Sequence, residues 1–140
     1  MERRGILRLG LASAAGSLFL PRAILAAGHG NATHSPMAGG VYYTRRNPGR
    51  WAKKIGGHLP TIEREGNKIE VTTGHPMKGF QHYIVKHMIL DENFRFVAET
   101  RFDPLKDAPM SSHDISKLRK TVYVASMCNI HDVWLNALYL

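Results

Sequence analysis

Polar and apolar residues alternate in short runs through the middle of the chain, and turn residues separate the runs. The run 94–102 places apolar side chains at 94, 96 and 98 and charged ones at 95, 99 and 101. Because successive side chains of a strand point to opposite faces, this period of two predicts half-buried strands. Gly66-Asn67 joins two such runs and predicts a hairpin. The expected strands are 41–44, 61–65, 68–73, 82–90, 94–102 and 121–127.

Helical periodicity is weak in the same region and is visible only over 112–120. Six or seven short strands within about 100 residues are typical of a sandwich. We therefore predict an all-β fold, an immunoglobulin-like antiparallel β-sandwich of about seven strands. The folded domain is expected to occupy 51–140. The stretch 28–50 is rich in Gly, Asn, Ser and Pro, which predicts a flexible N-terminal arm.

The first 27 residues have the layout of a twin-arginine signal peptide. An arginine pair, Arg3-Arg4, precedes an apolar run over 9–20, and small residues surround the expected cleavage position after Ala26 or Ala27. The apolar run is shorter than the ~20 residues that cross a bilayer. The segment 1–27 therefore predicts export to the periplasm by the twin-arginine route, without a membrane span. An amphipathic N-terminal helix is the alternative.

Composition narrows the chemistry that this fold could carry. The 140 residues include eight histidines but a single cysteine, which excludes an internal disulfide framework and a Cys₄ iron centre. Removing 1–26, with four arginines and one glutamate, lowers the formal net charge from +8 to +5. The remaining basic residues are scattered and form no helical stripe, so we expect no nucleic-acid partner.

Histidine and cysteine gather in three turn-like clusters: Gly57-His58-Leu59-Pro60, then His75-Pro76-Met77 with His82-Tyr83-Ile84, and Cys128-Asn129-Ile130-His131-Asp132-Val133-Trp134. A thiolate and an imidazole three residues apart can reach one metal ion from a tight turn. Taken alone, a cysteine is more often a buried small side chain, and a histidine on a strand is usually satisfied or exposed. Together, one cysteine and four histidines beside Pro or Gly point to a metal site.

These motifs resemble those of the superoxide reductase family, also called the desulfoferrodoxin or neelaredoxin family, over about 58–134. The resemblance implies one mononuclear non-haem iron, with four equatorial histidines and an axial cysteine. It also implies reduction of superoxide to hydrogen peroxide, with electrons from a small redox protein or another donor. By motif, the ligands would be His58, His75, His82, Cys128 and His131, with Cys128 also serving catalysis.

The chain departs from the family pattern in four places. One extra residue separates His75 from His82, which leaves His87 as an off-motif alternative. Gly56-Gly57 replaces the usual Glu-Lys, so Lys54 or Lys53 would supply the cation near the iron. Asp132 stands where a glycine is common. The Cys₄ iron domain is absent, which predicts a one-iron member.

Residues around the clusters have expected roles too. We expect Trp134 and Met77 to pack, Asn129 and main-chain carbonyls to orient the imidazoles, and His29, His34 and His113 to be surface residues. A homo-oligomer is compatible with the sequence.

Three other functions stay open. They are a cupredoxin-like electron-transfer protein, a non-catalytic iron or electron carrier, and a zinc-bound interaction domain. A cupredoxin usually has an axial Met after its last His, but the sequence has no Met after Met127. Structural zinc sites prefer four ligands and more thiolates.

Overall fold

The computed structural model describes residues 31–140. The predicted signal peptide, 1–27, and His29 lie outside this range. Among residues 31–140, no helix is long and apolar enough to cross a bilayer.

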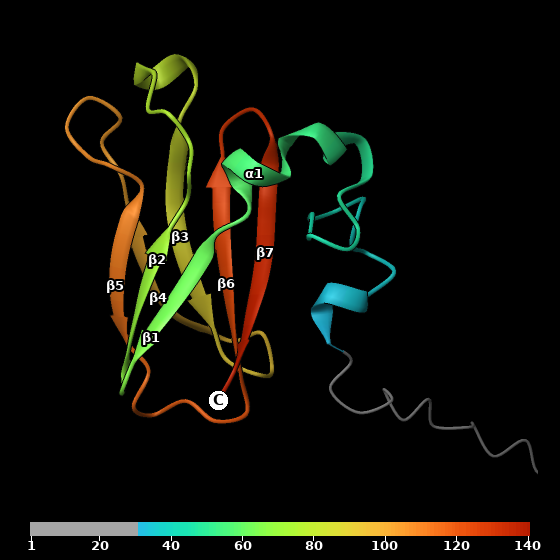
Figure 1. Ribbon diagram of the computed structural model, residues 1–140, viewed down its shortest axis with the longest axis vertical. Coiled ribbons are helices and arrows are strands. Elements are labelled where there is room, and N and C mark those ends of the chain that lie inside the picture. The colour runs from blue at the N-terminus through green and yellow to red at the C-terminus, as the bar shows by residue number, and fades with distance from the viewer. Residues whose placement is uncertain (1–30) are drawn as a thin grey trace, which may run out of the picture.

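Two antiparallel sheets form the body of the protein (Figure 1). The first has the strand order β1-β2-β5, from β1 (Thr61–Glu65), β2 (Lys68–Thr72) and β5 (Met110–Asp114). The second has the order β4-β3-β6-β7, from β4 (Phe96–Arg101), β3 (Ile84–Leu90), β6 (Thr121–Cys128) and β7 (Asp132–Tyr139). The predicted hairpin is present, because Glu65 pairs with Lys68 across Gly66-Asn67. The predicted all-β, immunoglobulin-like antiparallel fold is confirmed.

The main core lies between the two sheets. On β2, the alternate residues Ile69 and Val71 are fully buried while their neighbours are exposed or half-buried. They pack against Ile89 of β3 and Val122 and Val124 of β6. Burying a side chain of this size contributes roughly 1.5–3 kcal/mol, so this cluster is the main apolar contribution to sandwich stability.

The weak helical periodicity over 112–120 corresponds to no helix, and β5 covers the first part of that segment. Ser111 and His113 are the inward-facing residues of β5 and hydrogen-bond each other, with His113 Nε2 2.9 Å from Ser111 Oγ. Only 8% of His113 is exposed, so the expectation that it is a surface residue is wrong. His34 is exposed, as expected.

Part of the stretch 31–50 contacts the second sheet. The Tyr43 amide donates to the Val133 carbonyl at 2.8 Å, and the Leu135 amide donates to the Tyr43 carbonyl at 2.8 Å. Only 1% of Tyr43 is exposed. Tyr43 thus extends the edge of β7, while Ala32 and Tyr42 pack on the face that carries Leu135. This explains why Trp134 and Leu135 are both buried and why β7 lacks the alternation of a half-buried strand.

Three short helices lie in the N-terminal part of the described chain. They are the 3₁₀ segments η1 (Ala32–His34) and η2 (Gly49–Lys54), and the single-turn α1 (Ile55–His58). Figure 1 shows α1 at the end of the sandwich where the β6–β7 turn also lies. A third 3₁₀ turn, η3 (Gly79–Gln81), precedes β3.

Candidate metal centre

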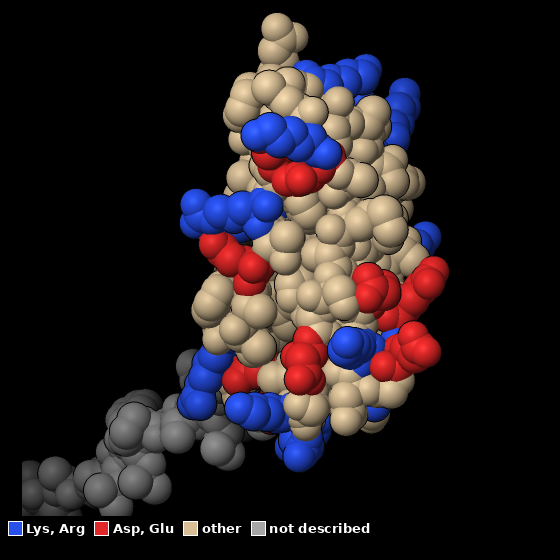
Figure 2. Space-filling view, turned by 90° about the vertical axis from the view of Figure 1, so that its left-hand side faces the viewer, with Lys and Arg blue, Asp and Glu red and all other residues tan. Residues whose placement is uncertain are grey.

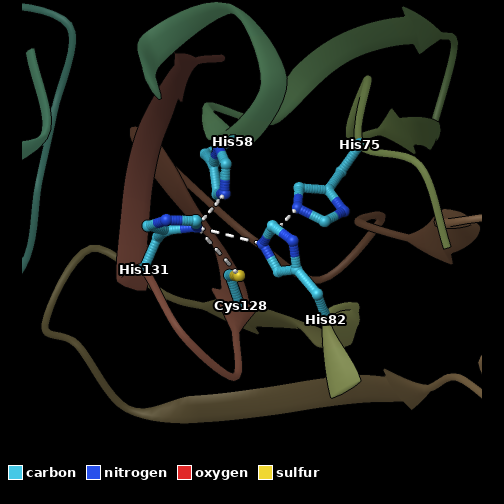
Figure 3. A group of neighbouring side chains, drawn as sticks. All are labelled: His58, His75, His82, Cys128 and His131. Carbon is cyan, nitrogen blue, oxygen red and sulfur yellow. Dashed lines mark hydrogen bonds between the residues drawn. The ribbon is translucent and has the colours of Figure 1, made fainter. Parts of the chain in front are cut away.

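Five side chains converge at one end of the sandwich, and each comes from a turn or from the end of an element. His58 closes α1, His75 follows β2, His82 follows η3, Cys128 ends β6, and His131 lies in the β6–β7 turn. Figure 3 shows the five side chains pointing toward one another. One ligand atom from each lies within 4.8 Å of all the others. The structure thus brings together every residue that the motifs select.

The imidazole nitrogens follow one another around the group. His58 Nε2 lies 2.9 Å from His131 Nδ1, which lies 3.1 Å from His82 Nε2. His82 Nε2 in turn lies 3.0 Å from His75 Nε2. The thiol of Cys128 is 3.6 Å from His131 Nδ1. Four nitrogens and one sulfur therefore surround a common centre.

This donor set fits a single first-row transition metal ion. Neighbouring nitrogens on one such ion, with bonds of about 2.1 Å at right angles, stand about 3 Å apart, as the three closest pairs do here. Hydrogen bonding among the rings does not account for the arrangement, because His131 Nδ1 faces two nitrogens and a sulfur and carries at most one proton. Imidazole and thiolate are ligands that iron, copper and zinc accept.

The environment keeps the four imidazoles neutral. Burial is the largest cause that lowers the pKa of each, and it brings the pKa of His58 to about 4. Neighbouring imidazoles and lysines add to the effect. For His75 the second cause is the charge on His82, and for His82 it is the charge on Lys78. Neutral imidazole is the form that binds metals, so the cluster is prepared for ligation at neutral pH.

Hydrogen bonds hold the ligand segments in place. His58 Nδ1 is 3.0 Å from the Lys54 carbonyl, which leaves Nε2 pointing to the centre. Asn129 accepts from the Tyr83 amide at 3.0 Å and donates to the Gln81 carbonyl at 3.1 Å. Asn129 therefore links the turn after Cys128 to the main chain on both sides of His82, and does not bond an imidazole.

The two residues expected to pack near the cluster do so. The Trp134 indole is fully buried and donates to the His131 carbonyl at 2.9 Å. Met77 packs against Ile84, Phe102 and Cys128.

The extra residue between His75 and His82 is accommodated by η3. Gly79 has a φ of +63°, a conformation that other residues rarely adopt, and the Lys78 amide donates to the His82 carbonyl at 3.0 Å across the resulting turn. His87 lies elsewhere, fully buried in the core between Thr73 and Ser111. His82, and not His87, therefore joins the cluster.

Two exposed lysines flank the cluster. Lys54 precedes α1, and its charge contributes to lowering the pKa of His82 and His131. Lys78 pairs with His82 in an antiparallel bridge, so the two side chains lie on the same face. The sequence suggested Lys54 and Lys53 but not Lys78, because only the turn around Gly79 brings Lys78 beside a ligand.

A contact between the N-terminal segment and the cluster was also not predicted. The Asp132 carboxylate accepts from Arg50 at 2.6 Å and from the indole of Trp51 at 2.8 Å. The Trp51 ring lies edge-on to the His131 imidazole, with 4.7 Å between centroids. These residues are about 80 positions apart in the chain, so no local pattern signals the contact.

Comparison with known proteins supports the resemblance that the motifs suggested. The chain is 38% identical over 80 residues to a protein described as a desulfoferrodoxin homolog from Archaeoglobus fulgidus. The match covers 55% of this chain and 59% of that relative's length. No protein-family model matches the chain.

Solved structures share the fold at lower identity. A superoxide reductase (neelaredoxin) from Ignicoccus hospitalis superposes with a TM-score of 0.61 at 22% identity, covering 71% of this chain and 93% of that one. A one-iron superoxide reductase from Giardia intestinalis gives a TM-score of 0.54 at 22% identity, covering 60% and 98%. Sequence and fold together confirm the predicted resemblance of this chain to the superoxide reductase family.

Proposed function

We propose that this protein is a one-iron superoxide reductase, which converts superoxide, one electron and two protons into hydrogen peroxide. The observation that carries the proposal is the convergence of four imidazole nitrogens and the Cys128 sulfur within 4.8 Å of one another. Blue copper sites use two histidines and one cysteine, and structural zinc sites use four ligands, so five donors of this kind favour neither. The similar solved proteins that are named superoxide reductases support the same reading.

The five clustered residues would hold the iron. When bound, the iron supplies the single electron that superoxide accepts. The neutral imidazoles of His58, His75, His82 and His131 add no charge to the centre. Cys128 would bind as thiolate, the form of cysteine that ligates metals, and its side chain is shielded because only 3% of the residue is exposed.

The lysines beside the cluster would draw in the anionic substrate. Lys54 and Lys78 are exposed, and both place positive charge close to His82. On the face that lies to the left in Figure 1, basic and acidic side chains are interspersed (Figure 2). A substrate at the cluster responds mainly to the local field, to which these two lysines contribute.

Export and electron supply complete the proposal. The arginine pair and apolar run of residues 1–27 support export to the periplasm as a folded protein. The reaction consumes one electron per superoxide, so a small redox protein or another donor must reduce the centre again.

Metal analysis and product stoichiometry test this function. Purified protein should contain one iron per chain and form one hydrogen peroxide per superoxide without evolving oxygen. Oxygen evolution would identify a dismutase. Copper or zinc in place of iron, or an iron protein that does not consume superoxide, would reject the proposal in favour of an electron carrier or a structural site.

A further inference from the structure

The segment from Cys128, which ends β6, to Asp132, which begins β7, carries two of the five proposed ligands. Asp132 has a φ of +63°, in the left-handed region that favours glycine. Glycine would adopt this backbone conformation with less strain, yet the chain has an aspartate here. The Asp132 carboxylate accepts hydrogen bonds from Arg50 and Trp51 of η2.

Trp51 connects this carboxylate to the ligand His131. Its indole N–H donates to Asp132 at 2.8 Å, and its ring lies at 87° to the His131 imidazole with 4.7 Å between centroids. Within residues 31–140, the hydrogen-bond contacts of the His131 ring all involve Nδ1, the nitrogen that faces the cluster. In the part of the chain that the structure describes, Trp51 is the one aromatic residue outside the ligand set that packs against this ring.

The N-terminal segment that carries Trp51 is itself fixed by contacts within it. Arg50 lies over the Trp51 ring, with its guanidinium carbon 5.0 Å from the centroid. A Cβ at Gly49 would collide with the Gly39 carbonyl, so only glycine permits this path of the chain. The indole of Trp51 and then the Arg50 guanidinium lower the pKa of Asp132, which keeps it ionised at neutral pH.

We propose that Asp132 and Trp51 form a positioning pair for His131: the carboxylate fixes the indole, and the indole fixes the imidazole that binds the metal. The proposal rests on the proposed iron site. The Arg50–Asp132 ion pair is largely exposed and worth little alone, so Arg50 has the minor part. The pair acts on the metal through the geometry of one ligand, and neither residue touches the substrate.

Substitution at Asp132 separates this role from simple support of the turn. Asp132→Gly removes the carboxylate but relieves the backbone at positive φ, so the variant should fold with a thermal midpoint at or above that of the unaltered protein. Its affinity for Fe(II), measured by chelator competition, should fall about 10–100-fold, the range for loss of groups that orient metal ligands. The sulfur-to-iron charge-transfer band of its oxidised form should also shift.

Two more variants and a control complete the test. Asp132→Asn keeps an acceptor for the indole and should recover most of the lost affinity. Trp51→Phe keeps the ring but loses the N–H, and it should reproduce part of the loss. Arg46→Gln, an exposed change in the same segment that does not touch Asp132, should match the unaltered protein in affinity and spectrum.

Folded Asp132→Gly and Trp51→Phe proteins with unchanged iron affinity and an unchanged band would overturn the positioning role. If Asp132→Gly does not fold, Trp51→Phe alone decides in the same way. Failure of the unaltered protein itself to bind iron would instead reject the proposed function, and the positioning role with it.

Discussion

Replacing His87 by leucine should destabilise the protein at neutral pH and have almost no effect at about pH 5. His87 is fully buried between the sheets, with Nε2 2.9 Å from Thr73 Oγ1 and Nδ1 2.8 Å from Ser111 Oγ. Leucine keeps the apolar contact with Phe102 but loses both hydrogen bonds. At about 1 kcal/mol each, the loss should lower the free energy of unfolding by about 2 kcal/mol at neutral pH.

At lower pH, the cost of keeping the buried His87 unprotonated offsets the stability that its two hydrogen bonds contribute. Burial, followed by the charge of His113, lowers the pKa of His87 to about 4. Below its ordinary pKa of about 6.5, the unfolded chain binds a proton at this histidine while the folded chain does not, so stability falls as the pH drops from about 6.5 to about 4. At pH 5, which is about 1.5 pH units below the pKa of the unfolded histidine, the free energy of unfolding has fallen by about 2 kcal/mol. That loss is about equal to the contribution of the two hydrogen bonds. The leucine variant has no titratable group at this position and does not lose this stability.

Denaturant unfolding of both proteins at about pH 7 and pH 5 measures the change. The metal ligands titrate equally in both proteins, so their effect cancels in the difference. Ile89→Val, a fully buried change on the same strand without a titratable group, is the control and should cost about 1 kcal/mol at both pH values. A leucine variant destabilised equally at both pH values would refute the claim that burial holds His87 neutral.

Three further predictions concern the cluster and its surroundings. Cys128→Ser should lose the sulfur-to-iron charge-transfer band and most of the activity, and an unchanged spectrum would reject Cys128 as a ligand. His82→Ala should strip the iron while His87→Ala retains one iron per chain, and metal analysis showing the reverse would contradict the assignment of His82. Lys78→Ala should lower the second-order rate constant for superoxide severalfold at low ionic strength and less at high ionic strength. Equal rates in pulse-radiolysis measurements on Lys78→Ala and on the control Lys117→Ala, an exposed lysine beyond β5, would dismiss a steering role for Lys78.

Alternation along the sequence predicts a strand most directly where its two faces differ in environment. β2 has one buried and one exposed face, so its alternation is visible, and Gly66-Asn67 marks its hairpin with β1. β7 was missed because Ala32 and Tyr42 cover its second face and remove the alternation. β5 was missed because its buried positions carry polar Ser111 and His113, which resemble surface residues until their hydrogen bonds are known.

The cluster residues were predictable because each lies in a short motif beside a turn. Their surroundings were less accessible. Lys78 comes close to His82 only through the conformation of Gly79, and Trp51 meets Asp132 only because η2 folds over the β6–β7 turn. Local motifs therefore identify the candidate ligands, whereas contacts between distant segments decide which cations and aromatic rings surround them.

The position of the cluster at the end of the sandwich explains why such contacts are needed. The main apolar core lies between the sheets, and only two smaller clusters, around Trp134 and around Cys128, reach the turns that carry the imidazoles, so polar contacts are also needed to hold the ligand segments. The Lys54 carbonyl orients His58, and Asn129 joins the segments that carry Cys128 and His82. The His75 amide donates at 2.7 Å to the carbonyl of Thr73, whose hydroxyl is anchored in the buried network of His87. His87 therefore contributes to the cluster without joining it, because it anchors the segment that presents His75.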